Sequence, residues 1–138
     1  MLKSITVADC MTSHPLTFRA DTDLLLAIEK LLAHRISAAP VVDEHARLLG
    51  LLSDGDCLRA TLAATYYDSV GGCAADYMTT QVDTVTPQVD LSEVAGILLQ
   101  NARHCLPVLE NGRLVGLVSR HDVLRGLKAF AQHAAKLP

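Results

Sequence analysis

The stretch Gly50-Leu51-Leu52-Ser53-Asp54-Gly55-Asp56 has a second copy in this chain, Gly116-Leu117-Val118-Ser119-Arg120-His121-Asp122. Both copies have a glycine, two apolar residues, a serine, and an aspartate three positions after the serine. An apolar run that meets Ser-x-x-Asp is typical of a strand that leads into a helix, because the serine and the acid can form a capping box. The duplication predicts that the chain is built from two similar units.

The similarity between the two halves extends well beyond this motif. The residues that recur at an offset of 67 positions are Asp9, Met11, Thr12, Thr17, Asp23, Leu24, Pro40 and Val41, which fall on Asp76, Met78, Thr79, Thr84, Asp90, Leu91, Pro107 and Val108. The turn between the two hairpin strands is one residue shorter in the second copy, so the offset falls to 66. At this offset the two Ser-x-x-Asp motifs align. We predict one repeat at residues 1–64, a second at 75–138, and a connector at 65–74 that has no counterpart.

The sequence pattern of each repeat predicts the element order β-α-β-β-α, so the expected fold class is α+β. The elements expected in the first repeat are a strand around 16–18, an amphipathic helix that begins at Asp23, hairpin strands at 39–42 and 48–52, and a helix from Ser53. Those expected in the second are a helix at 90–102, strands at 105–109 and 114–118 joined by the turn 110–112, and a helix from 119 to about 136. Two such units packed together would cover their apolar sheet faces and form two similar clefts, which are common ligand sites.

Composition excludes several classes of function. With 12 Lys and Arg against 15 Asp and Glu, the net charge of −3 leaves no basic field for nucleic acid. Charged residues make up only 20% and apolar residues 50%, which predicts an oligomer. The four cysteines lack metal-site spacing and fit a reduced cytoplasm. No apolar run is long enough to predict a membrane span, so we expect a soluble protein.

The repeated motif has two interpretations, and both can hold together. In the structural one, the serine and the aspartate only cap the helix that follows. In the functional one, the helix N-terminus and the hydroxyl face an anion, while the carboxylate accepts two hydrogen bonds from a ribose diol.

Several shorter motifs, taken in their order along the chain, resemble those of a known family. The matching pieces are the openings 7–12 and 74–79, the strands 39–43 and 106–110, and the two Ser-x-x-Asp junctions. Together they resemble a pair of CBS domains, the module named after cystathionine β-synthase, in its stand-alone bacterial form. The resemblance implies a non-catalytic regulatory module, usually a homodimer, that binds AMP, ATP or S-adenosylmethionine between its repeats and needs no cofactor.

The resemblance also implies which residues form the two clefts. The preferred cleft would contain Ser119, Asp122, Arg120 and His104 from the second repeat, with Leu16, Ile36, Ser37 and Ala38 from the first. The second cleft would contain Ser53 and Asp56 from the first repeat, with Val82, Arg103 and Cys105. In both, the motif aspartate would hold the ribose hydroxyls and the motif serine would approach the phosphate.

The two junctions differ in charge. Asp54 follows the first motif serine, whereas Arg120 and His121 follow the second. We therefore expect AMP or ATP to prefer the cleft of Asp122, since a like charge disfavours a phosphate beside Asp54. The cleft of Asp56 would stay empty or take a ligand with a cationic tail, such as S-adenosylmethionine.

Several other residues have simpler explanations. Arg59 and Arg125, one helical turn after the motif aspartates, can contact a phosphate or form an intrahelical ion pair, and we favour the ion pair. Cys57 and Cys105 are expected to be small buried side chains. The competing function is a ligand-independent assembly module, in which the motifs act only as caps. An enzyme is the least favoured class, because the sequence offers no nucleophile with a base, no metal cluster and no complete phosphate-binding loop.

Overall fold

The computed structural model describes residues 5–67, 71–101 and 103–135. The chain divides into two compact units. Unit 1 combines Met1–Pro15 with Asp83–Pro138, and unit 2 is the continuous stretch Leu16–Val82. The opening segment of the first repeat therefore belongs to the same compact unit as most of the second repeat. The segment that opens the second repeat, in turn, belongs to unit 2.

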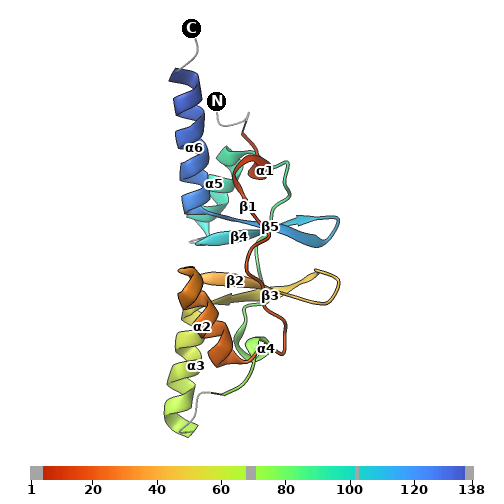
Figure 1. Ribbon diagram of the computed structural model, residues 1–138, viewed down its shortest axis with the longest axis vertical. Helices are drawn as coiled ribbons and strands as arrows, with labels where there is room; N and C mark the ends of the chain where they lie inside the picture. Colours follow the sequence, from red (N-terminus) through yellow and green to blue (C-terminus); the bar gives the residue numbers. More distant parts are fainter. Residues whose placement is uncertain (1–4, 68–70, 102, 136–138) are drawn as a thin grey trace. The chain divides into compact units, whose positions relative to one another are not determined.

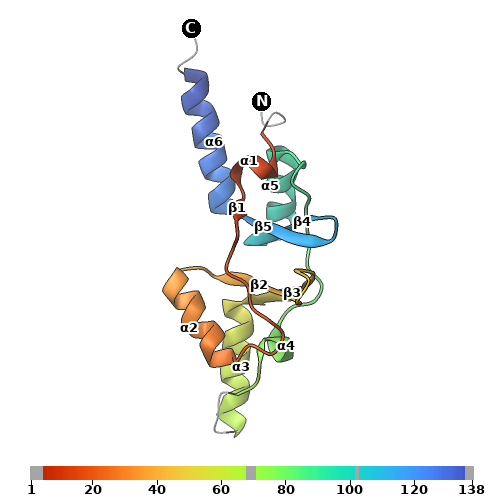
Figure 2. The same ribbon diagram turned by 45° about the vertical axis from the view of Figure 1, so that its right-hand side comes forward.

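Unit 2 is a β-hairpin with two helices on one face (Figures 1 and 2). Its elements are α2 (Leu24–His34), β2 (Ala38–Val42), β3 (Leu48–Ser53), α3 (Asp54–Tyr67) and the short α4 (Ala74–Tyr77). Strands β2 and β3 are antiparallel, and a register shift lies between Val41 and Val42. The predicted start of α2 is confirmed, because the Asp23 side chain accepts a hydrogen bond from the Leu26 N–H.

Unit 1 repeats this arrangement and adds a short edge strand (Figures 1 and 2). Its elements are α1 (Val7–Cys10), β1 (Thr12–Ser13), α5 (Leu91–Gln100), β4 (Cys105–Glu110), β5 (Arg113–Ser119) and α6 (Arg120–Ala135). The strand order is β1-β5-β4, with both pairs antiparallel. The predicted Asn-Gly turn is confirmed, since Asn111 and Gly112 both have positive φ angles, 53° and 78°.

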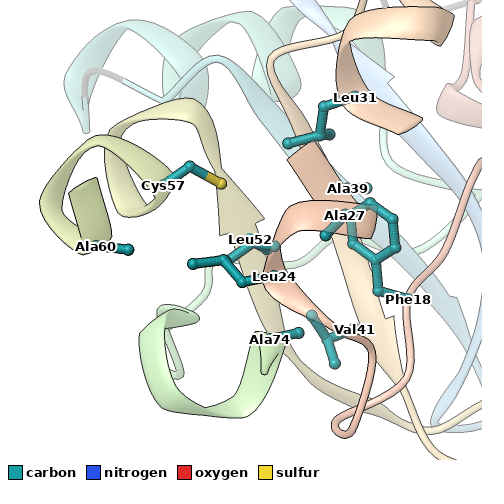
Figure 3. Packing of buried hydrophobic residues seen from close by; sticks show 10 residues of the cluster. All are labelled: Phe18, Leu24, Ala27, Leu31, Ala39, Val41, Leu52, Cys57, Ala60 and Ala74. Atoms are coloured by element: carbon teal, nitrogen blue, oxygen red, sulfur yellow. The ribbon is translucent and has the colours of Figure 1, made fainter. Parts of the chain in front are cut away.

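The core of unit 2 lies between its hairpin and its helices (Figure 3). The fully or almost fully buried members are Phe18, Leu24, Ala27, Leu31, Ala39, Val41, Leu52, Cys57, Ala60 and Ala74. The corresponding core of unit 1 consists of Val7, Val85, Val94, Leu98, Leu106, Val108 and Val118. Each unit thus buries its own apolar cluster.

The predicted opening strand around 16–18 is reduced to one parallel bridge between Phe18 and Val41. Phe18 makes two backbone hydrogen bonds to β2, and the chain then turns at Arg19–Thr22, where the Arg19 N–H donates to the Thr22 hydroxyl. In unit 1, Val85 likewise forms a single bridge, to Val108. A strand that turns away this early cannot extend its ladder.

Other element boundaries differ from the prediction by a few residues. Helix α3 continues through Tyr67, so the first three residues of the expected connector are helical. Residues 68–70, also within that connector, lie outside the described residues, as do Ala102 and Lys136, where two helices were expected to end. Helix α5 stops at Gln100.

Candidate ligand-binding site

The motif of unit 1 forms the junction between β5 and α6. The Ser119 Oγ accepts a hydrogen bond from the Asp122 N–H at 3.2 Å. The Asp122 Oδ2 accepts hydrogen bonds from the Ser119 N–H at 2.8 Å and from the Ser119 hydroxyl at 3.0 Å. Asp122 is only 3% exposed. The capping interpretation of this motif is therefore confirmed.

The junction between β3 and α3 in unit 2 has the same geometry. The Ser53 Oγ accepts from the Asp56 N–H at 3.2 Å, and the Asp56 Oδ2 accepts from the Ser53 N–H at 2.8 Å and from its hydroxyl at 3.0 Å. Asp56 is 1% exposed. Two buried carboxylates are thus each fixed at the first turn of a helix, where the helix dipole favours their negative charge.

The second oxygen of each carboxylate has one charged and one neutral donor. The Asp122 Oδ1 accepts from the Arg125 guanidinium and, at 3.2 Å, from the Thr12 hydroxyl. The Asp56 Oδ1 accepts from Arg59 and, at 3.2 Å, from Thr79. The expected intrahelical ion pairs are confirmed.

Thr12 and Thr79 were not predicted as site residues, although both lie in the repeated openings. Each belongs to a Met-Thr pair that recurs at the offset of 67. The spacing within the chain could not reveal their contacts, because 110 and 23 positions separate the threonines from the aspartates to which they donate. The repeated Met-Thr pair was the signal that could have identified them.

The motif glycines allow the threonines to approach. A Cβ atom at Gly116 would lie 2.6 Å from the Met11 Sδ and 3.0 Å from the Thr12 carbonyl oxygen. At Gly50 it would lie 2.7 Å from the Thr79 carbonyl oxygen. Only a residue without a side chain lets the Met-Thr segment lie this close to the strand.

The carboxylates also affect nearby thiols. Burial raises the pKa of Cys105 to about 11, and the charge of Asp122 adds to the effect. The pKa of Cys10 is raised by burial first and by Asp122 next, while burial and Asp56 raise that of Cys57. These thiols are therefore held in the neutral form, which is a poor nucleophile. The expected burial of Cys57 and Cys105 is confirmed, each being 7% exposed.

The residues that follow the two serines face different partners. The Arg120 Nε donates to the Arg103 carbonyl at 3.2 Å, and its terminal nitrogen lies 3.5 Å from the Leu98 carbonyl of α5. The Arg103 Nε forms an ion pair with Asp83 at 3.2 Å. In unit 2, the Asp54 carboxylate accepts from the Gly55 N–H at 2.7 Å. The expected difference in charge is therefore present, but main-chain carbonyls of unit 1 hold the Arg120 guanidinium.

The remaining predicted site residues are divided between the two units. Unit 1 contains Ser119, Asp122, Arg120, His104, Arg103 and Cys105, and unit 2 contains Ser53, Asp56, Val82, Leu16, Ile36, Ser37 and Ala38. His104 and Ser37, which occupy equivalent positions, are both exposed, and their carbonyls accept the backbone N–H of Arg120 and of Asp54. Each predicted cleft draws on both units, so its assembly stays a prediction.

In the described ranges, no three His, Cys, Asp or Glu side chains are grouped so that they could hold a metal ion. Among the helices in the part of the chain that the structure describes, none is long and apolar enough to cross a membrane.

Two similar units, each with a hairpin, a helix pair and a buried Ser-x-x-Asp cap, define a tandem-repeat module. The family model of the CBS domain matches residues 7–63 and 74–129. The chain therefore belongs to the CBS domain family, and the resemblance in the sequence is confirmed.

Comparisons with individual proteins agree with this membership. The chain is 31% identical over 119 residues to protein MJ1225 of Methanocaldococcus jannaschii, and the match covers 86% of this chain but only 41% of that protein. It is 28% identical to CBSX2, solved in complex with AMP, with a TM-score of 0.83 and coverage of 92% and 98%. It is 26% identical to the CBS domain pair of MJ0100, solved with 5′-methylthioadenosine and S-adenosylmethionine, with a TM-score of 0.78 and coverage of 91% and 97%.

Proposed function

We propose that this chain is a regulatory module that binds AMP, ATP or S-adenosylmethionine and signals its occupancy to a partner protein. CBSX2 with AMP and MJ0100 with S-adenosylmethionine support adenosine-containing ligands as the class. Signalling requires that the ligand favour one conformation or assembly over another.

The buried carboxylate at the start of a helix carries this proposal. The Asp122 Oδ2 is fixed by Ser119, so the orientation of the carboxylate is set before any ligand arrives. Its Oδ1 is held by Thr12 and by Arg125, whose side chain is 59% exposed. A ribose diol offers two hydroxyl donors to such an oxygen, and the helix N-terminus favours a phosphate nearby.

We assign AMP and ATP to the cleft of Ser119 and Asp122, with Arg120 and His104 beside it. The residues that would complete this cleft are Leu16, Ile36, Ser37 and Ala38. Because carbonyls of unit 1 hold the Arg120 guanidinium, it supplies a positive charge at a fixed place and needs no reorganisation to attract a phosphate.

The cleft of Ser53 and Asp56 would be completed by Val82, Arg103 and Cys105. The exposed Asp54 carboxylate follows Ser53 and repels a phosphate group. We therefore expect this cleft to remain empty with AMP or to accept the cationic tail of S-adenosylmethionine.

We infer that the module binds its ligand without transforming it, in a reducing compartment such as the cytoplasm. The neutral thiols of Cys10, Cys57 and Cys105 are poorly suited to nucleophilic attack. All four cysteines are free, as in proteins of a reducing compartment. Energy sensing follows if AMP and ATP compete for one cleft.

We further infer that the module acts as a homodimer, because its helices expose several large apolar side chains. The strongly exposed ones are Leu25, Leu32, Leu58, Leu62, Leu99 and Leu124. Leu58 and Leu62 lie one turn apart on α3, so they form a stripe that a second copy can cover. Sedimentation equilibrium should give a dimer for the native chain and a shift toward monomer for Leu58→Lys/Leu62→Lys.

One observation favours the alternative, a ligand-independent assembly module. Each motif carboxylate has donors on both of its oxygens within its own unit, so capping needs no ligand. In this case an Asp→Asn change would cost little stability, because asparagine also caps a helix.

Isothermal titration calorimetry separates the two functions. The dialysed protein is titrated with AMP, ATP and S-adenosylmethionine, and so are Asp122→Asn and Asp56→Asn, after mass analysis has excluded a copurified ligand. We expect Asp122→Asn to abolish AMP binding and Asp56→Asn to leave it intact. Absence of binding by the folded native protein to all three ligands would establish the assembly function instead.

A further inference from the structure

The Thr12 and Thr79 hydroxyls occupy the side of each motif carboxylate that the serine leaves free. Thr12 donates to the Asp122 Oδ1, while Ser119 takes the Oδ2. Thr79 and Ser53 divide the oxygens of Asp56 in the same way. The recurrence in both units makes the threonine a regular part of the site.

The backbone brings each threonine to this place. Thr12 of β1 pairs with Leu117 of β5, and Thr79 forms a reciprocal pair of backbone hydrogen bonds with Leu51 of β3. The motif glycines permit these close approaches. In each unit the motif glycine, the threonine and the motif aspartate therefore lie together in the fold, although the threonine is far from the other two in the sequence.

The threonines lie close to the points at which the chain passes from one unit to the other. Unit 1 gives way to unit 2 between Pro15 and Leu16, three positions after Thr12. Unit 2 gives way to unit 1 between Val82 and Asp83, three positions after Thr79. The hydroxyl that orients each carboxylate thus belongs to a segment that connects the two units covalently.

A ribose hydroxyl that approaches the Asp122 Oδ1 must displace a donor or share the oxygen with it. The hydrogen bond from Arg125 is charge-assisted and joins residues of one helix turn, so it is the stronger of the two. The hydrogen bond from Thr12 is neutral, long at 3.2 Å, and made by an exposed residue. The threonine hydroxyl is therefore the donor that gives way.

We propose that Thr12 and Thr79 are positioning residues that compete with a ribose diol for the motif aspartates, so that ligand binding releases the connecting segments. This inference rests on the proposed function, and it adds the step by which occupancy changes the protein. In the free protein, the Thr12 hydroxyl donates to Asp122 and so joins β1 to the first turn of α6. In the bound protein, the ligand takes the Asp122 Oδ1, and β1 loses this hydrogen bond to α6.

The test compares Thr12→Val, which removes the hydroxyl at nearly equal volume, with Thr12→Ser, which retains it. Thr84→Val is the matched control, since Thr84 is an exposed threonine of unit 1 and its side chain makes no hydrogen bond within the described residues. Calorimetry with AMP should give a dissociation constant about 2- to 10-fold lower for Thr12→Val, the range of one net neutral hydrogen bond. Thr12→Ser and Thr84→Val should match the native protein.

Hydrogen exchange measures the release itself. In the native protein, AMP should increase amide exchange in residues 11–13, and Thr12→Val should show that faster exchange without ligand. If Thr12→Val fails to fold, Thr12→Ala provides the same two measurements.

The outcomes keep the two proposals apart. A native protein that binds neither AMP nor ATP overturns the proposed function and this competition together. A native protein that binds AMP while Thr12→Val binds no more tightly overturns the competition alone. Slower or unchanged exchange at residues 11–13 on binding overturns the release step.

Discussion

At the scale of single residues, the motif glycines show how one missing side chain shapes a site. Gly116 lets the Met11-Thr12 segment lie against β5, and the Thr12 hydroxyl then reaches Asp122. The repeat identified the glycine as a motif residue. It did not predict that the glycine accommodates another segment, because that segment is about a hundred positions away in the sequence.

Gly116→Ala should therefore lower the free energy of unfolding by roughly 1–3 kcal/mol, since the new methyl overlaps the Met11 sulfur and the Thr12 carbonyl. Gly96→Ala is the control, because a Cβ at that helical position meets no atom within 4 Å beyond the backbone of its own helix. It should raise stability by about 0.5–1 kcal/mol. Urea denaturation measures both, and equal effects of the two changes would contradict the steric role of Gly116.

Cys105 should make stability depend on alkaline pH. Its folded pKa is about 11, against an ordinary value of 9.0. Well below pH 9 the thiol is neutral in both the folded and the unfolded state, so its contribution is complete. As the pH rises from 9 toward 11, the unfolded chain loses the proton first and the folded state is weakened.

The expected loss between pH 7 and pH 10.5 is about 2 kcal/mol from this group. Other groups titrate in the same range, so the native protein is compared with Cys105→Ala. Alanine is the residue that the first repeat has at the equivalent position, Ala38. Urea unfolding under reducing conditions should give a steeper decline for the native protein. Parallel declines in the two proteins would contradict the prediction.

At the scale of elements, the sequence predicted what depends on local chemistry. Asp23 and Asp90 begin α2 and α5 because each carboxylate accepts an N–H of the first turn. Asn111 and Gly112 form their turn because both tolerate positive φ angles. The four-residue helices α1 and α4 were missed because they are too short to show a period. The Thr6-x-x-Asp9 capping box was the available signal for α1.

The N-cap of α5 allows a quantitative test of this local control. Asp90→Ala should destabilise unit 1 by about 1 kcal/mol, because the Glu93 N–H loses its acceptor at 2.9 Å. Asp90→Asn should cost much less, since asparagine caps almost as well. Thermal and urea unfolding measure the difference, and equal losses would show that the charge of Asp90 matters more than its cap.

At the scale of the whole molecule, the repeat predicted two units but not their composition. The two repeats open with very similar segments, Val7–Thr12 and Ala74–Thr79. The repeat pattern therefore does not predict which of the two cores each segment joins. The structure places Val7 in the core of unit 1 and Ala74 in that of unit 2, both fully buried. The motif aspartates were predicted, whereas the pairing of each aspartate with its threonine depends on how the openings are shared between the units and could not be predicted.

The composition of the two compact units predicts which fragments of the chain can fold. The fragment 16–82 contains the complete core of unit 2, including Ala74 and the packed Met78, so it should unfold cooperatively in urea. The fragment 1–64 follows the sequence repeat but lacks both residues, and 83–138 lacks the buried Val7. We expect neither of these to give a cooperative transition, and we expect a peptide of residues 1–15 to increase the helicity of 83–138. Circular dichroism measures all four cases. A cooperative 1–64 beside an unfolded 16–82 would mean that the sequence repeat, and not the compact unit, is the folding unit of this chain.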